Sequence, residues 1–181
     1  LDARRPRMGQ GTATNGMSVI ELDHEYYGRR RLWCERQPTL LFTENETNSR
    51  RLYGDVDGAR YVKDSFHDYV INHNKTAVNS GKIGSKSAAQ YILTIGSGVS
   101  ETIHLRFTNK DGLQELAGKA FNGVFTQRRR EADEFYDELA PPDLSDDARL
   151  VQRQAFAGLL WSKQFYHYDL NRWIKGDPDM P

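Results

Sequence analysis

The sequence lacks several features that would assign a chain to a class at once. Its 181 residues include one cysteine, Cys34, so neither a disulfide framework nor a cysteine zinc site can form within the chain. No run of 18 apolar residues occurs, which predicts that nothing spans a membrane. The 25 basic and 25 acidic residues cancel, so no field of one sign steers the molecule to nucleic acid or an anionic membrane. The single cysteine favours a reducing compartment, and we predict a cytoplasmic protein.

Motifs of general catalytic chemistry are missing as well. The sequence has no phosphate-cradling glycine loop, no nucleophile elbow and no His-Glu-x-x-His pair. Asp64, His67 and Asp68 would share a face if their segment were helical, which is a weak metal-like spacing. A solvated surface with a hydrogen-bonded histidine explains them more simply. We therefore predict no metal and no cofactor.

Apolar runs in residues 17–43 predict strands. Turn-prone residues, including Gly28 and Pro38, separate three of them. Residues 1–16 show no periodicity and are interpreted as a loop or ragged end, and residues 44–60 as polar turns. The runs contain Val19, Ile20 and Leu22, then Leu32 and Trp33, then Leu40, Leu41 and Phe42.

A further strand signal lies around the Gly-Ser-Gly at residues 96–98. It is flanked by residues 90–95 and 101–108, which predict an antiparallel hairpin. Ile103, Leu105 and Phe107 alternate with polar residues, so we expect these three to face the core of the sheet and His104 and Arg106 to face solvent.

The period then changes to that of helices. Apolar residues recur three or four apart over residues 113–139, and a Pro-Pro pair at 141–142 ends that pattern. Ser145 fits the N-cap of a second helix, with Asp146 and Asp147 in its first turn, and we expect this helix to continue to about Trp173. Residues 61–71 mix helix and strand signals and stay open.

The second helix is apolar on nearly every side at its start. Such a helix belongs in the core of a large domain. Because few residues follow it, we expect it to be the first piece of a domain whose remainder lies outside this chain. Alone, it would expose more apolar surface than a soluble monomer usually tolerates.

A polar cluster follows the third apolar run. Glu44, Asn45, Glu46 and Asn48 stand together there, and carboxylates and amides can bond sugar hydroxyls. A capped turn that satisfies its own backbone is an equal alternative.

Several segments resemble glycoside hydrolase family 63, the bacterial and fungal relatives of mannosyl-oligosaccharide glucosidase. The resemblance covers roughly residues 38–178 in order, and its first and last motifs are the most specific. The segments that carry the resemblance are LFTENETN at 41–48, RLYG at 51–54, KDSFHDYVI at 63–71, AVN at 77–79, GSKSAA at 84–89, EADEFY at 131–136 and the helix at 151–169.

The resemblance implies an inverting α-glucosidase in which an N-terminal β-sandwich is joined through a helical linker to an (α/α)6 barrel. Inversion needs two carboxyl groups about 6.5–9.5 Å apart with water between them. No carboxylate of this chain matches the catalytic acid or base, so the chain alone is expected to be inactive. In such a barrel the aromatic end of the last helix would lie near the pocket, where Trp161 and Gln164 suit a sugar. Packing between linker and barrel is the simpler role for both.

The expected fold is therefore α+β, a partial antiparallel β-sandwich followed by a helical linker and the first helix of an (α/α)6 barrel. The expected parts are a loop at 1–16, the later sandwich at 17–112, the linker at 113–142 and the barrel helix at 143–181. The expected partners are an α-glucoside and the rest of the chain's own polypeptide, with no nucleic acid or membrane. The alternative is a freestanding glycan-binding or interaction module that uses the polar cluster and has no catalysis.

Overall fold

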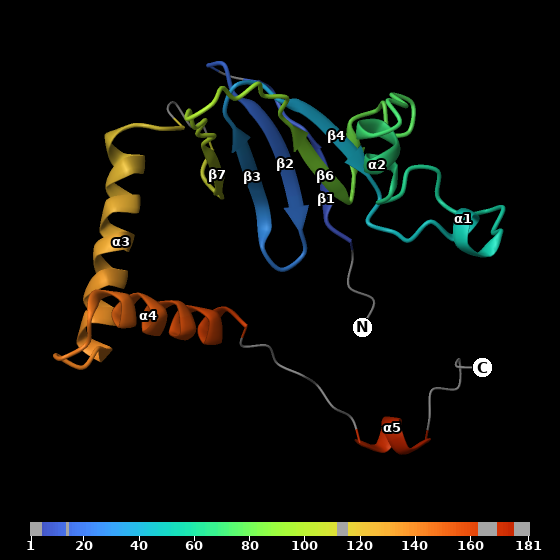
Figure 1. Cartoon of the computed structure of the whole chain (residues 1–181). Coiled ribbons are helices and arrows are strands. Elements are labelled where there is room, and N and C mark those ends of the chain that lie inside the picture. The colour runs from blue at the N-terminus through green and yellow to red at the C-terminus, as the bar shows by residue number, and fades with distance from the viewer. Residues whose placement is uncertain (1–4, 14, 112–115, 163–169, 176–181) are drawn as a thin grey trace. The chain divides into compact units, whose positions relative to one another are not determined.

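The computed structural model describes residues 5–13, 15–111, 116–162 and 170–175. It is an α+β structure with two antiparallel sheets, as the sequence predicts. The chain divides into two compact units, residues 1–122 and 123–181, and the predicted linker spans their boundary. Figure 1 shows the elements of both.

The larger sheet has five strands in the order β5-β1-β2-β3-β7. β2 and β3, of seven residues each, form a hairpin that turns at residues 25–27 and re-enters the sheet at Gly28, which has a left-handed backbone. The strands are β1 (Arg7–Gln10), β2 (Ser18–His24), β3 (Gly28–Cys34), β5 (Ile83–Gly84) and β7 (Leu105–Thr108).

The smaller sheet pairs β4 (Thr39–Thr43) with β6 (Lys86–Gln90). Leu40 and Phe42 of β4 pack against Ile20 of the larger sheet, with Met8, Leu32 and Ala89 around them. The two sheets thus share a buried core, and the predicted runs at 19–22 and 40–42 supply its buried members Ile20, Leu40 and Phe42. On the other face of β4, Leu41 packs with Tyr69 and Val78.

The chain crosses from one sheet to the other between β5 and β6, at Ser85. There the Ser85 amide donates to the Thr43 carbonyl at 3.1 Å, at the end of β4. Gly84 lies so close to this strand that a Cβ would overlap the Thr43 carbonyl oxygen. A glycine is therefore required where the strand bends from one sheet to the next.

The helices differ in how much of them is buried. α1 (Ser49–Tyr53) lies in the segment expected to be turns and ends at Gly54, whose φ of 70° suits glycine. α2 (Ser65–Val70) resolves the open segment as helical and buries Tyr69. The other helices are α3 (Lys119–Leu139), α4 (Asp146–Trp161) and α5 (Leu170–Lys175).

α3 and α4 contact each other through charged side chains. Arg153 pairs with Asp133 at 2.6 Å and lies 4.9 Å from the ring centre of Tyr136. Ser145 caps α4 as predicted, its hydroxyl accepting from the Ala148 amide at 3.3 Å, with both aspartates in the first turn. No residue of α3 or α4 is buried within the part of the chain that the structure describes.

Two strand predictions are wrong. The expected loop at 1–16 contains β1, which pairs with both β2 and β5. The only apolar residue of β1 is Met8, so the strand has no alternating pattern of apolar residues by which the sequence could reveal it. The expected hairpin around residues 96–98 does not form: residues 91–95 are not in a strand, β6 ends at Gln90 and pairs with β4, and β7 pairs with β3. Alternation identified a strand at 105–108 but carries no information about its partner.

The expected burial of Leu105 and Phe107 is also wrong. They lie opposite Cys34 and Leu32 and so point to the core side of the larger sheet, yet they are 49% and 60% exposed. Ile103, just before β7, is half-buried, as are His104 and Arg106. The reason is geometric: the two-stranded sheet is too narrow to reach β7.

The last helical prediction is wrong in length. α4 ends at Trp161, and Ser162 forms its C-cap by donating to the Gly158 carbonyl at 2.9 Å. α5, which contains Trp173, is a separate helix. The Ala- and Leu-rich part before Trp161 favours the helix more strongly than the aromatic and polar residues after it.

Candidate functional site

The predicted polar cluster lies directly after β4, on a segment held by its backbone. The Glu44 amide donates to the Tyr61 carbonyl at 2.7 Å, and the Lys63 amide donates to the Glu46 carbonyl at 3.2 Å. Residues 44–46 therefore run beside residues 61–63 and are fixed in place. A fixed backbone is required of a binding site and of a structural turn alike, so these hydrogen bonds fit both interpretations of the cluster.

The side chains at the start of the cluster bond within the protein. The Ser85 hydroxyl donates to the Glu44 carboxylate and accepts from the Asn45 amide at 2.9 Å. Glu46 forms an ion pair with Arg5. Glu44 and Glu46 are half-buried, whereas Asn45 is exposed.

Asn48 has a structural role at the start of α1. Its side-chain oxygen accepts from the Arg51 amide at 3.1 Å, and its nitrogen donates to Asp64 Oδ2 at 2.9 Å. Arg51 adds a longer ion pair to the same oxygen at 3.6 Å. Asp64 Oδ1 is buried with no hydrogen-bond donor among the described residues. The capped-turn interpretation thus accounts for Asn48, and the substrate-binding assignment of the cluster stays a prediction.

Glu44 also lines a cavity of about 190 Å³ next to the sheet edge. Arg5, Arg7, Asn79 and Ile83 line it as well. This cavity shares Arg7 and Ile83 with a larger one of about 310 Å³. The predicted cluster therefore borders a pair of adjoining hollows rather than an isolated turn.

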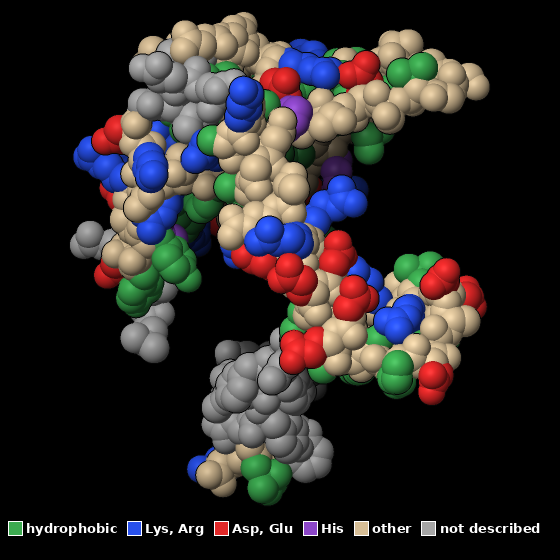
Figure 2. Space-filling view, turned by 90° about the vertical axis from the view of Figure 1, so that its left-hand side faces the viewer, with side chains coloured by type: hydrophobic (Ala, Val, Ile, Leu, Met, Phe, Trp, Pro, Cys, Tyr) green, Lys and Arg blue, Asp and Glu red, His purple; other side chains and the backbone are tan. Residues whose placement is uncertain are grey.

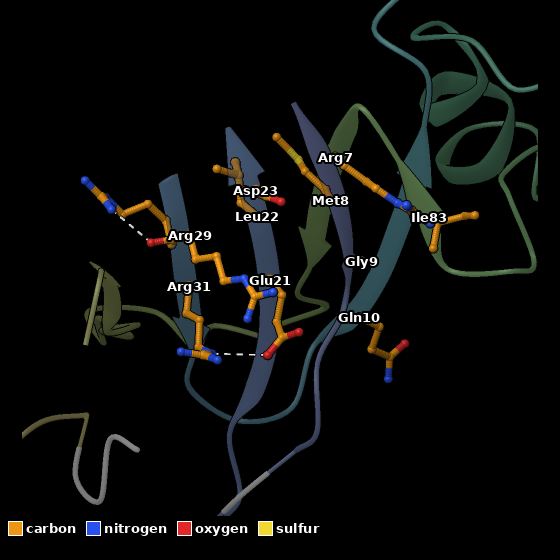
Figure 3. Close-up of a pocket in the computed structure, with 11 residues that line it drawn as sticks. Arg7, Met8, Gly9, Gln10, Glu21, Leu22, Asp23, Arg29, Arg31 and Ile83 are labelled. Carbon is orange, nitrogen blue, oxygen red and sulfur yellow. Dashed lines mark hydrogen bonds and ion pairs between the residues drawn. The ribbon is translucent and has the colours of Figure 1, made fainter. Parts of the chain in front are cut away.

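The larger cavity lies on the outer face of the five-stranded sheet (Figure 3). Gly9 forms its floor, since a Cβ there would meet only Ile83 Cγ2 at 3.7 Å and the Lys82 carbonyl at 3.8 Å. The register sets Gly9 opposite Glu21, and Glu21 opposite Arg31. One row further on, Arg7, Asp23 and Arg29 lie side by side on successive strands.

Charges of both signs alternate across this cavity. Arg31 Nε donates to Glu21 at 3.1 Å, and the same guanidinium pairs with Asp111. Guanidinium groups donate hydrogen bonds and carboxylates accept them, so the surface offers both partners that a polyhydroxylated ligand needs. Sequence reasoning missed this site. The pattern that could have revealed the site is the spacing of its charges: Glu21 and Asp23 lie two residues apart on one strand, and Arg29 and Arg31 lie two residues apart on the next, so each pair shares a face of the sheet.

A second polar cluster joins the ends of β3 and β7. Glu35 accepts from the backbone amide and ring Nδ1 of His104, at 2.7 and 2.8 Å. The backbone bond, helped by the imidazole, lowers the pKa of Glu35. Tyr91 donates to the Glu35 carbonyl at 2.8 Å, and burial raises the pKa of Tyr91 to about 12.

Cys34 belongs to the same region but is inaccessible. It is fully buried, and burial raises the pKa of its thiol, an effect that hydrogen bonding to Tyr91 partly offsets. A thiol in this state is a poor nucleophile and metal ligand. The cluster therefore fastens the ends of β3 and β7 to each other, and its thiol is shielded from solvent.

The helical site residues are not brought to either cavity. Trp161 lies at the end of α4 and is 94% exposed. Gln164 lies outside the described residues. The substrate-binding assignments of Trp161 and Gln164 stay predictions.

The metal-like spacing resolves into separate hydrogen bonds. Asp64 binds Asn48, while Asp68 accepts from Asn72 at 3.0 Å. Among the described residues, no three His, Cys, Asp or Glu side chains are grouped to hold a metal ion. No described helix is both long and apolar enough to cross a bilayer.

Comparison with known proteins gives one curated relative. The chain is 37% identical over 153 residues to the uncharacterized protein YMR196W of Saccharomyces cerevisiae. The match covers 79% of the chain but only 14% of the yeast protein, so the chain spans a small part of this relative's length. No protein-family profile matches the chain, and no solved structure matches it.

Proposed function

We propose that this chain is part of a longer glycoside hydrolase of the family 63 type, which hydrolyses α-glucosidic bonds with inversion. The observation that carries the proposal is the order of the architecture. Two antiparallel sheets with a shared core are followed by helices whose apolar side chains are exposed. This is the order expected of a sandwich, a linker and the entry to an (α/α)6 barrel.

The length of the yeast relative also supports the proposal. The yeast relative is several times longer than the matched segment, which leaves room for a catalytic domain elsewhere in a protein of this kind. The motifs at 41–48 and 151–169, on which the resemblance depends most, lie within the proposed sandwich and the proposed barrel entry. The catalytic carboxylates are assigned to the remainder of the polypeptide, and the single buried thiol of Cys34 suits a reducing compartment such as the cytoplasm.

The test is an assay of the complete polypeptide on α-linked glucose disaccharides, with the anomer of the released glucose followed by proton NMR. An inverting enzyme releases β-glucose first, because water attacks the face opposite the leaving group. The 181-residue chain alone should release no glucose. Initial release of α-glucose, or no hydrolysis by the complete polypeptide, would contradict the proposal. Activity of the short chain that Glu44→Gln removes would contradict it as well.

Trp161 gives the assay a second use. If its ring binds substrate, Trp161→Ala in the complete enzyme should raise KM or lower kcat while Tm changes little. If it packs in an interface, Tm should fall while the kinetic constants per folded molecule stay the same. Gln164→Ala extends the same comparison to the neighbouring amide.

A second candidate is glycan binding without catalysis. The adjoining cavities favour it, because Glu44, Arg7, Glu21 and Arg31 offer acceptors and donors around a glycine floor. Titration of the 181-residue chain with α-linked glucose oligosaccharides, followed by NMR shifts, tests it. Glu21→Gln should weaken binding, whereas Asp57→Asn, on a distant loop, should leave it unchanged. Absence of shifts at millimolar sugar would remove this candidate.

A further inference from the structure

The five-stranded sheet has an uncovered strip on its core side. Phe107 lies opposite Leu32, which lies opposite Ile20, so the three side chains share the face that forms the core. Ile20 is 3% exposed and Leu32 is partly buried, but Phe107 is 60% exposed. Burial thus falls steadily from β2 to β7 across one continuous face.

The second sheet ends at the border of this strip. β4 pairs with β6 along all five residues of each strand, so one edge of β6 is occupied. No hydrogen bond to the other edge of β6 occurs among the described residues. Ala89 of β6 belongs to the core cluster that reaches Leu32, and Tyr91, just after β6, bonds to Glu35 after β3. The free edge of β6 therefore points towards β7, which lies beyond β3 (Figure 1).

A strand added to this edge would cover the strip. Neighbouring strands lie about 4.8 Å apart, and facing sheets about 10 Å apart, so each strand added after β6 extends the smaller sheet by one strand in the direction of β3 and β7. Its inward side chains would contact Leu105 and Phe107. Its backbone would pair with amides and carbonyls of β6 that a free edge leaves open to any extended chain.

We infer that the free edge of β6 is the docking site of a β-strand from the remainder of the same polypeptide, with apolar residues at alternate positions. The length of the yeast relative argues for this occupant, because the matched segment is 14% of a protein with ample further chain to supply a strand. The narrowness of the smaller sheet argues for a strand rather than a helix, since two strands alone are marginal and a third restores pairing and burial together. The inference rests on the chain being part of a longer polypeptide, as the proposed function does, but not on that polypeptide's activity.

Hydrogen exchange measured by mass spectrometry tests this on the complete polypeptide and the 181-residue chain. The peptide covering 86–90 should exchange at least roughly tenfold more slowly in the complete polypeptide, because strand pairing closes amides that are otherwise open, and the peptide covering 105–108 should be slowed as well, because its face becomes covered. A peptide covering 24–28, at the tip of the β2–β3 hairpin, is the internal control and should be the same in both. Equal exchange of β6 in the two proteins would overturn the inference.

Two other outcomes would also overturn it. If exchange becomes slower at 105–108 but is unchanged at 86–90, something other than a strand covers the face. Protection of both segments in the short chain that rises with its concentration would mean that a second copy is the occupant. Because exchange does not depend on hydrolysis, failure of the glucosidase assay leaves this test unaffected, and the reverse also holds.

A matched pair of substitutions gives an independent measurement. Phe107→Asp should lower Tm strongly in the complete polypeptide and little in the 181-residue chain, where the side chain is already exposed. Tyr26→Asp, at a hairpin position that is 72% exposed, should have a small effect in both. If Phe107→Asp lowers Tm equally in the two proteins, the strip is not a docking surface.

Discussion

The two units of this chain place their apolar side chains in opposite ways. In residues 1–122 the core residues Leu40, Leu41 and Phe42 are at most 3% exposed. In residues 123–181 the leucines at 159 and 160 are 69% and 61% exposed, and α4 buries nothing. Figure 2 shows such hydrophobic side chains at the surface among charged ones.

This difference indicates where the stability of the chain lies. Burial of apolar area is the main stabilising contribution in folding, and among the described residues the buried apolar side chains all lie in residues 1–122. The helices depend on capping and on ion pairs, each of which contributes about 1 kcal/mol or less. An apolar helix with little of its surface buried is suited to packing against a partner that completes it.

The largest expected effect separates the two units with one kind of substitution. Leu41→Ala removes side-chain atoms packed against Tyr69 and Val78 and should cost about 2–5 kcal/mol. Leu159→Ala makes the same change on an exposed helix and should cost less than about 0.5 kcal/mol, since alanine also favours helices. Urea unfolding of both variants measures the contrast. Equal losses would mean that the helices contribute as much to stability as the sheets.

A smaller effect compares two helix caps. Asn48→Ala removes the cap of α1 and the hydrogen bond to the half-buried Asp64, so it should cost about 1–2 kcal/mol. Ser145→Ala removes only a cap at 3.3 Å and should reduce the helical circular dichroism of α4 with little change in the main unfolding transition. Asn45→Ala, at an exposed position in the same segment as Asn48, serves as control. An Asn48 variant of unchanged stability would return that residue to the candidate binding set.

The sequence predicted the elements better than their partners. β2, β3, β4 and the capped start of α4 follow from local patterns, because alternation, turn residues and capping residues act over a few positions. The partners of β6 and β7 could not be predicted, since any strand of suitable register can pair with any other. β1 was missed because four mostly polar residues form a strand only when both neighbours already offer their edges.

The candidate site shows the same limit. The cluster at 44–48 was found because its residues are adjacent in sequence, and Asn48 resolves to a cap by contacts with its neighbours. The cavity over Gly9 was missed because three strands from separate parts of the sequence build it. Its floor is Gly9, which has no side chain, and a glycine marks a cavity only when the positions of the neighbouring strands are known.

A pH experiment tests the polar cluster that fastens β3 to β7. The pKa of Tyr91 is raised from its ordinary 10 to about 12 in the folded protein. A raised folded pKa gives stability that is fully present below pH 10 and is lost as the pH rises through 12. Tyr91→Phe should cost about 0.5–1.5 kcal/mol at neutral pH and make the alkaline loss shallower. A variant that loses stability as steeply as the parent over this range would show that Tyr91 is not responsible.

The smallest expected effect compares ion pairs in the two units. Arg130 and Glu134 pair at 3.3 Å along α3, but both side chains are about two-thirds exposed. Such pairs contribute roughly 0.2–0.5 kcal/mol, and the order of arginine before glutamate is the weaker one on a helix. Glu134→Ala should therefore change helix stability by less than about 0.5 kcal/mol, and the change should vanish near 1 M salt, where the Debye length is about 3 Å.

Glu21→Ala provides the contrast in the sheet. It removes one of two acidic partners of Arg31, whose side chain is only 24% exposed, so screening by salt is weaker there. Its cost should be nearer 1 kcal/mol and should persist in high salt, because a half-buried guanidinium loses a hydrogen bond that water replaces poorly. Parallel unfolding curves at low and high salt measure both variants. If the two losses respond to salt alike, Arg31 is solvated as freely as Arg130, and its ion pairs do not hold the charged side chains of the cavity in place.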